Sequence, residues 1–128
     1  MQAHLRVARP VTDLAAAVKQ YTAGLDLSLL GSFEDHSGFD GAMVGRAGQH
    51  YHFEFTVCHH HPQRPSPTPE DLLVFYIASE TQWRQACARM LAAGFIQVAP
   101  LNPYWAQRGC TFQDHDGYCT VLQHAAWS

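Results

Sequence analysis

The chain has 128 residues, 47% of them hydrophobic and 15% charged, so it can bury a core of ordinary size, and a wholly disordered chain is excluded. Eight Lys and Arg residues stand against eleven Asp and Glu residues, and no basic stripe could neutralise phosphates, which argues against a nucleic-acid binder. No apolar stretch approaches the roughly 18–20 residues of a membrane span, and no secretory signal opens the chain, so we expect a cytoplasmic protein.

The first half is predicted to fold as a strand, a helix and three more strands. Residues 4–9 are typical of a short strand, after which Thr12 or Asp13 can cap a helix. One apolar stripe at helical spacing predicts that helix over residues 13–23, with Gly24 expected as the residue that ends it in the left-handed conformation. Three strand-like runs follow, separated by glycine turns: Leu27–Phe33, Ala42–Arg46 and His50–Cys58.

The second half repeats this order. The apolar run Leu72–Ile77 predicts a strand, and Ser79 or Thr81 can cap a helix over residues 80–93 that Gly94 ends. Three short strands are predicted after it, at Phe95–Ala99, Gly109–Gln113 and Tyr118–His124. The chain is therefore predicted to be an α+β protein made of two βαβββ modules.

A proline-rich segment separates the two modules. Residues 61–71 contain four prolines and are expected to be extended or turn-like. We place module one at residues 1–58, the linker at 59–71 and module two at 72–128.

The ordered set of these features resembles a known superfamily. The two βαβββ modules, the D-x-D-G turn at residues 114–117 and the A-A-G-F at residues 92–95 are similar to the vicinal oxygen chelate group, which includes glyoxalases, bleomycin-resistance proteins and extradiol dioxygenases. The resemblance covers essentially the whole chain. It implies one domain whose modules form an open, curved mixed sheet around a cleft, commonly a homodimer, with a divalent metal in the cleft.

The resemblance places the family's metal ligands on four strands, and this sequence keeps few of them. Glu54 matches the carboxylate ligand and is the expected catalytic and metal-binding residue. Arg6 stands near a histidine position, and arginine cannot ligate a cation, although His4 could do so if the register slides by two residues. The strand Leu72–Ile77 offers no ligand, and Val121 stands where a glutamate is expected. No tightly bound cofactor is therefore expected. A divalent metal (Zn, Ni, Fe or Mn) is expected only if the protein is an enzyme.

The alternation of residues 51–56 gives a strand with two unlike faces. Tyr51, Phe53 and Phe55 lie on one face, which should pack on the helices. His52 and Glu54 lie on the other, toward the cleft. A pair between Arg6 and Glu54 would satisfy both charges, and an arginine that keeps free donors could also hold a carboxylate or phosphate.

Three other groups of residues are candidates for chemistry. Tyr104 and Trp105 form a rigid aromatic turn that either packs on the core or walls a pocket. His59, His60 and His61 resemble a metal site, but no nearby carboxylate is evident and solvated loop histidines are favoured. The four cysteines lack C-x-x-C spacing, and free thiols are favoured over disulfides.

Two function classes follow. The first is a module that binds a small planar or anionic molecule, with Arg6, His52, Tyr104, Trp105 and Val121 as contacts and the metal site degenerate. The second is a glyoxalase-type lyase, isomerase or dioxygenase that uses a divalent metal held by Glu54 with His4 or His52. Either would act on a small molecule, with no nucleic acid or membrane partner.

Overall fold

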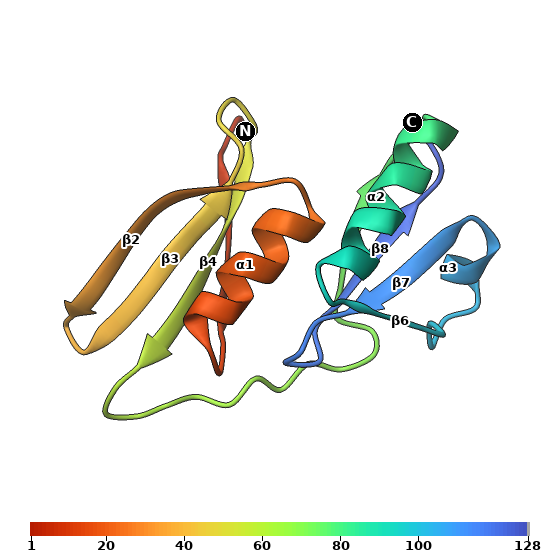
Figure 1. Ribbon diagram of the computed structural model, residues 1–128. Coiled ribbons are helices and arrows are strands. Elements are labelled where there is room, and N and C mark those ends of the chain that lie inside the picture. Colours follow the sequence, from red (N-terminus) through yellow and green to blue (C-terminus); the bar gives the residue numbers. More distant parts are fainter. Residues whose placement is uncertain (128) are drawn as a thin grey trace. The chain divides into compact units, whose positions relative to one another are not determined.

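A computed structural model describes residues 1–127, which form two compact units joined near Pro65. The first unit runs to Pro65 and holds a single four-stranded sheet in the order β1-β4-β3-β2, with β1 parallel to β4 and the other pairs antiparallel (Figure 1). Its elements are β1 (Leu5–Pro10), α1 (Leu14–Gly24), β2 (Ser28–His36), β3 (Phe39–Gly45) and β4 (Tyr51–Cys58).

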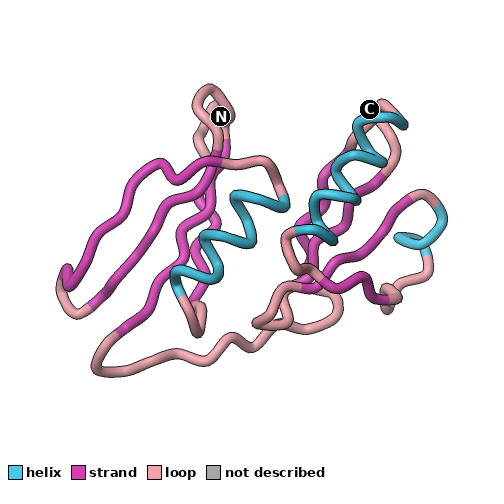
Figure 2. Tube along the Cα trace, viewed as in Figure 1, coloured by secondary structure: helices cyan, strands magenta, loops and turns pink. Residues whose placement is uncertain are grey.

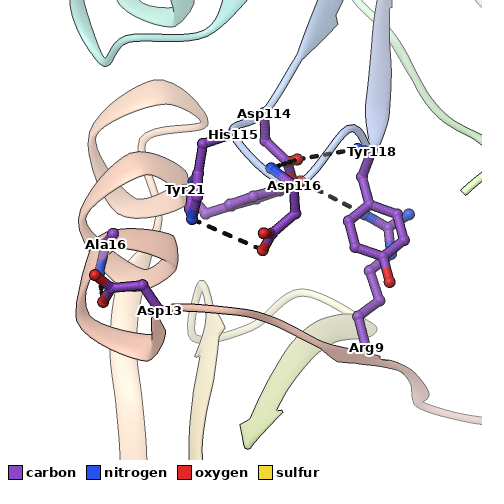
Figure 3. Close-up of polar contacts among 8 residues, drawn as sticks. All are labelled: Arg9, Asp13, Ala16, Tyr21, Asp114, His115, Asp116 and Tyr118. Carbon is purple, nitrogen blue, oxygen red and sulfur yellow. Dashed lines mark hydrogen bonds and ion pairs between the residues drawn. The ribbon is translucent and has the colours of Figure 1, made fainter. Parts of the chain in front are cut away.

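Helix α1 begins at a side-chain cap and ends without the expected glycine geometry. Asp13 is the cap: its carboxylate accepts a hydrogen bond of 3.0 Å from the backbone N–H of Ala16 (Figure 3). The prediction for Gly24 was wrong, because Gly24 is the last helical residue and is buried, and Leu25 is the C-cap. The chain turns instead at Asp26, whose φ of 54° lies in the left-handed region.

The core of the first unit forms where α1 lies on β4. Phe53 and Phe55 are almost completely buried, and both rings contact Tyr21 of α1, with centroid distances of 6.2 and 4.8 Å. Val44 of β3 pairs with Phe53 and is also buried. Burying large apolar side chains is the main favourable term in folding, so this aromatic face fixes which side of the sheet α1 covers.

The second unit, from Ser66 onward, repeats the topology with shorter strands. Its sheet has the order β5-β8-β7-β6, with β5 parallel to β8, and Figure 2 shows the longer loops that join the strands. Its elements are β5 (Leu72–Tyr76), α2 (Glu80–Ala92), β6 (Ile96–Val98), α3 (Tyr104–Gln107), β7 (Gly109–Gln113) and β8 (Cys119–Gln123).

Side-chain caps and one glycine set the ends of these elements. Ser79 caps α2 by accepting a hydrogen bond of 3.2 Å from the N–H of Gln82, and Gly94 follows the helix with a φ of 90°. Between β7 and β8, one carboxylate oxygen of Asp114 accepts from the N–H groups of Asp116 and Tyr118, each at 2.9 Å (Figure 3). The D-x-D-G motif is therefore a side-chain-stabilised turn into β8.

The predicted fold class is confirmed: both units have the βαβββ order, and the long helices lie within one residue of their predicted limits. The short helix α3 was not predicted, because the pattern of Asn102–Trp105 is typical of a turn; Pro103 is its N-cap, and the side chain of Asn102 accepts a hydrogen bond from the N–H of Tyr104. No helix in residues 1–127 combines the length and hydropathy needed to cross a membrane.

Truncating the buried face of β4 should destabilise the protein strongly. We expect Phe53→Ala to lower the free energy of unfolding by about 3–5 kcal/mol, because a buried ring is replaced by a cavity. The matched control is Phe39→Ala, at a phenylalanine that is 41% exposed, and it should cost less than about 1 kcal/mol. Urea unfolding measures both, and equal losses in the two variants would contradict the assigned faces.

Candidate functional site

The polar face of the first unit brings together residues that are about fifty positions apart in the sequence. In the parallel pair β1–β4, Arg6 lies opposite His52, and alternation places Glu54 two residues further along on the same face. The helix covers the opposite face, so these polar side chains need not be buried among aromatic rings. The predicted faces of β4 and the predicted Arg6–Glu54 pair are both present.

Four side chains form one continuous network on this face. The guanidinium of Arg6 donates from Nη1 to Glu54 Oε2 at 3.0 Å and from Nε to His52 Nε2 at 2.8 Å. His52 Nδ1 lies 2.5 Å from His4 Nε2. The Arg6 side chain is 49% exposed and that of Glu54 is 16% exposed, so the network opens to solvent on the arginine side.

The direction of these hydrogen bonds fixes the protonation state of His52. The guanidinium N–H can only donate, so Nε2 of His52 accepts, and the neutral ring carries its proton on Nδ1, directed at His4. Partial removal from water lowers the pKa of His52 below its usual 6.5, and the charge of Arg6 and the nearby His4 lower it further, while Glu54 opposes them. A neutral His52 is the form that can hold Arg6.

Apolar side chains cover the neighbouring part of the same face. Met43 lies opposite Glu54, and three glycines, Gly31, Gly41 and Gly45, leave space above β2 and β3. A Cβ at Gly41 would clash with the Phe33 ring, and one at Gly45 would meet Leu30 at 3.0 Å. The absence of these Cβ atoms therefore lets Phe33 and Leu30 lie against the sheet beside the charged network.

The predicted site residues of the second unit lie in different environments. Tyr104 and Trp105 pack edge-to-face in α3, with centroids 5.0 Å apart, and Tyr104 is 53% exposed. Val121 is completely buried at the centre of its sheet, opposite Val74. The roles of these three residues as ligand contacts stay predictions.

A pocket of about 570 Å³ opens in the second unit at the edge of β7. Strand β6 pairs with β7 only at Thr111–Gln113, so Gly109 and Cys110 lie beyond the paired part of this edge. Among α3 residues, Ala106 lines the pocket, whereas Tyr104 and Trp105 do not. Thr111 also lines it, and its buried hydroxyl has no hydrogen-bond partner within the described residues. Sequence reasoning missed Thr111, because a threonine in a strand gives no signal of its own.

The prediction that His59 is a solvated histidine with no nearby carboxylate was wrong. The β2–β3 hairpin brings Asp40 to 2.9 Å from His59 Nε2 and Asp35 to 3.6 Å from Nδ1. The hydrogen bond to Asp40 raises the pKa of His59 above 6.5, and the pKa of Asp40 is lowered by bonds from the Asp35 backbone and from His59. The two aspartates were overlooked because they are about twenty residues distant in sequence.

No group of three or more His, Cys, Asp or Glu side chains within residues 1–127 is arranged to hold a metal ion. His4, His52 and Glu54 are close to one another, but the guanidinium of Arg6 bonds to two of them.

Comparison with known proteins identifies the family. Residues 5–56 match the YycE-like N-terminal domain and residues 70–124 the YycE-like C-terminal domain. An uncharacterized protein YycE of Bacillus subtilis is 35% identical over 123 residues, covering 96% of this chain and 88% of the relative. The chain belongs to the YycE-like family. The fold and its structural neighbours place this YycE-like chain in the vicinal oxygen chelate superfamily.

Solved structures agree with this assignment. The crystal structure of the Bacillus subtilis YycE protein has a TM-score of 0.90 at 34% identity, over 99% of this chain and 93% of that one. The fosfomycin resistance protein FosX from Mesorhizobium loti has a TM-score of 0.75 at 12% identity, with 98% and 94% coverage. TnmS3, an antibiotic binding protein from Streptomyces sp. CB03234, has a TM-score of 0.68 at 20% identity, with 98% and 97% coverage. The last two likenesses show the fold alone.

The pKa of His52 should report on the network. We expect His52 to titrate below 6.5 in NMR spectra, and Arg6→Met to raise its pKa, because a neighbouring positive charge is removed. Arg46→Met, which breaks only the exposed pair with Asp26, should leave it unchanged.

The same shift predicts how stability depends on pH. As pH falls through about 6.5, the unfolded chain binds the His52 proton before the folded chain does, so this group destabilises the fold increasingly toward acid. A pKa of His52 above 6.5 in the unmodified protein would contradict the network.

Proposed function

We propose that this YycE-like protein binds a small anionic molecule with an apolar body on the polar face of its first unit, and that it holds no tightly bound catalytic metal. The observation that supports the proposal is the position of Arg6. Its Nε and Nη1 atoms are engaged by His52 and Glu54, which leaves Nη2 without a partner among the described residues, on a side chain that is half exposed.

The chemistry of a guanidinium indicates the class of ligand. Arginine binds carboxylates and phosphates through several donors in a fixed plane, and it stays charged at every physiological pH. Glu54 and His52 hold this plane in one orientation, so little side-chain entropy remains to be lost on binding. Leu30, Phe33 and Met43 provide an adjoining apolar surface for the rest of the ligand.

The same residues do not fit the divalent metal that the superfamily commonly uses. A cation between Glu54 and His52 would meet the fixed positive charge of Arg6. In the second unit, β5 contains only Leu72, Leu73, Val74, Phe75 and Tyr76, and Val121 stands at the remaining position. Retained catalytic metals in proteins normally have three or more protein ligands.

One observation favours a second candidate function, a metal-dependent lyase, isomerase or dioxygenase of the glyoxalase type. Two imidazoles and a carboxylate, from His4, His52 and Glu54, lie on one face. They would become ligands only if Arg6 moved away and freed the Nε2 lone pair of His52 and the Glu54 carboxylate. In either case we expect a cytoplasmic homodimer.

The anion-binding proposal is tested with phenylphosphonate, an anion with a planar apolar body. Titration followed by NMR should shift the Arg6 and His52 resonances in a saturable way, while neutral benzamide should not. Arg6→Met should weaken phenylphosphonate binding by about tenfold or more, as expected for a charged hydrogen bond, and Arg46→Met should not. Equal binding by both variants would overturn the anion site.

The metal proposal is tested separately by elemental analysis of protein purified without nickel affinity and dialysed against a mild chelator. We expect well below one metal ion per chain, in both the unmodified protein and Glu54→Ala. About one ion per chain, lost in Glu54→Ala, would establish the metalloenzyme instead.

A further inference from the structure

The outer edge of β7 is only partly covered by its neighbour β6. The register of these two antiparallel strands ends at the pair Val98–Thr111. Two residues further along the same register, Pro100 would stand opposite Gly109. Proline has no N–H group, so Pro100 cannot donate the hydrogen bond that another residue would supply there. Strand β6 therefore ends at Val98, and it leaves Gly109 without a partner strand on this side.

The hydrogen bonds on the other side of β7 show where the main chain of Gly109 points. Just before β7, the C=O of Arg108 accepts from the N–H of His124 at 2.7 Å. Just after β7, the N–H of Asp114 donates to the C=O of Tyr118 at 2.9 Å. The N–H and C=O groups of successive residues in an antiparallel strand point to alternate sides, so the even-numbered residues bond toward β8. Gly109 therefore directs both its N–H and its C=O to the side where β6 has stopped.

The pocket of about 570 Å³ lies at this position, and its volume is in the ordinary range of small-molecule sites. Gly109 lines it, and a glycine can line a pocket only with its main chain. Pro100 and Ala106 also line it, and their short side chains leave the space open. Thr111 is 3% exposed and lines the pocket too, and its hydroxyl has no hydrogen-bond partner in residues 1–127. The pocket thus combines open space with polar groups that a ligand could satisfy.

We propose that this pocket binds a short peptide-like ligand, which pairs with the main chain of Gly109 as one more residue of β6 would. Two opposite residues of an antiparallel pair can exchange two hydrogen bonds. The ligand must therefore carry an N–H donor and a C=O acceptor on either side of one carbon, which is the pattern of an acylated amino-acid amide. Its N–H donates to the C=O of Gly109, and its C=O accepts from the N–H of Gly109.

Addition of an extended chain to an open strand edge is a recurring mode of peptide recognition. The small side chains around the pocket set no strong demand on the ligand's side chain, so the main-chain pattern is the feature that is recognised. The proposal does not depend on the anion site of the first unit.

Two small probes test the proposed pairing. N-acetyl-L-alanine N-methylamide carries the required pattern, and N-acetyl-L-proline N-methylamide is the matched control, because its ring removes the central N–H. In NMR titrations we expect the alanine probe to shift the amide resonance of Gly109 in a saturable way and to slow its hydrogen exchange. The proline probe should do neither. Equal effects of the two probes, or no saturable shift of Gly109 with the alanine probe, would overturn the proposal.

A variant that fills the pocket tests its location. Ala106→Leu places a larger side chain in the space that the ligand needs, so it should weaken binding of the alanine probe about tenfold or more. Ala92→Leu, at an exposed position of α2 outside the pocket, should leave binding unchanged. Circular dichroism checks that both variants are folded. Full affinity in Ala106→Leu would overturn the assignment of the pocket as the site.

A second variant tests the role of the proline without filling the pocket. Pro100→Ala supplies an N–H opposite Gly109, so the chain can extend β6 and pair there itself. We expect slower hydrogen exchange at the Gly109 amide without ligand and weaker binding of the alanine probe, whereas Pro69→Ala in the exposed linker should change neither. Gly109 itself is not replaced, because a Cβ there would clash with the side chain of Gln123. Full affinity in Pro100→Ala would overturn the proposed pairing with Gly109.

Discussion

The burial of one face of β4 against α1 is the constraint on which the first unit depends. Phe53 and Phe55 contact Tyr21, and their removal from water sets the register of the strand. A slip of one residue would bury Glu54 and His52 among aromatic rings and leave both phenylalanines in solvent. The same hydrophobic term that stabilises the core therefore determines the orientation of the polar residues on the other face.

Charge balance then decides what that polar face can do. A partly buried carboxylate needs a positive partner, and here Arg6 provides it within the chain. In the proposed site this fixed charge bonds to the carboxylate of Glu54 and to the imidazole of His52. A guanidinium differs from a metal ion because it offers hydrogen-bond donors and has no open coordination positions. This difference favours anion binding over metal chemistry in the proposed site.

The second unit uses the same βαβββ order for a different surface. Its central strand β8 is buried along its whole length, and β5 beside it is apolar, so this sheet offers no charged network comparable to that of the first unit. Strand β6 pairs with only part of β7. A pocket lies beside the remaining edge of β7 and is lined by Gly109, Cys110 and Thr111 among other residues. The two units thus show that a shared topology does not determine a shared chemistry.

The sequence by itself determined the fold class, the two long helices and the two faces of β4, because each depends on a local period or a local cap. Asp13, Ser79 and the alternation of residues 51–56 are signals of this kind. Only the tertiary structure decided which distant residues meet: the His4–His52 contact and the two aspartates beside His59. The left-handed residue after α1 is Asp26, whereas the sequence pattern predicted Gly24. Such contacts depend on strand pairing and helix packing, which no local pattern specifies.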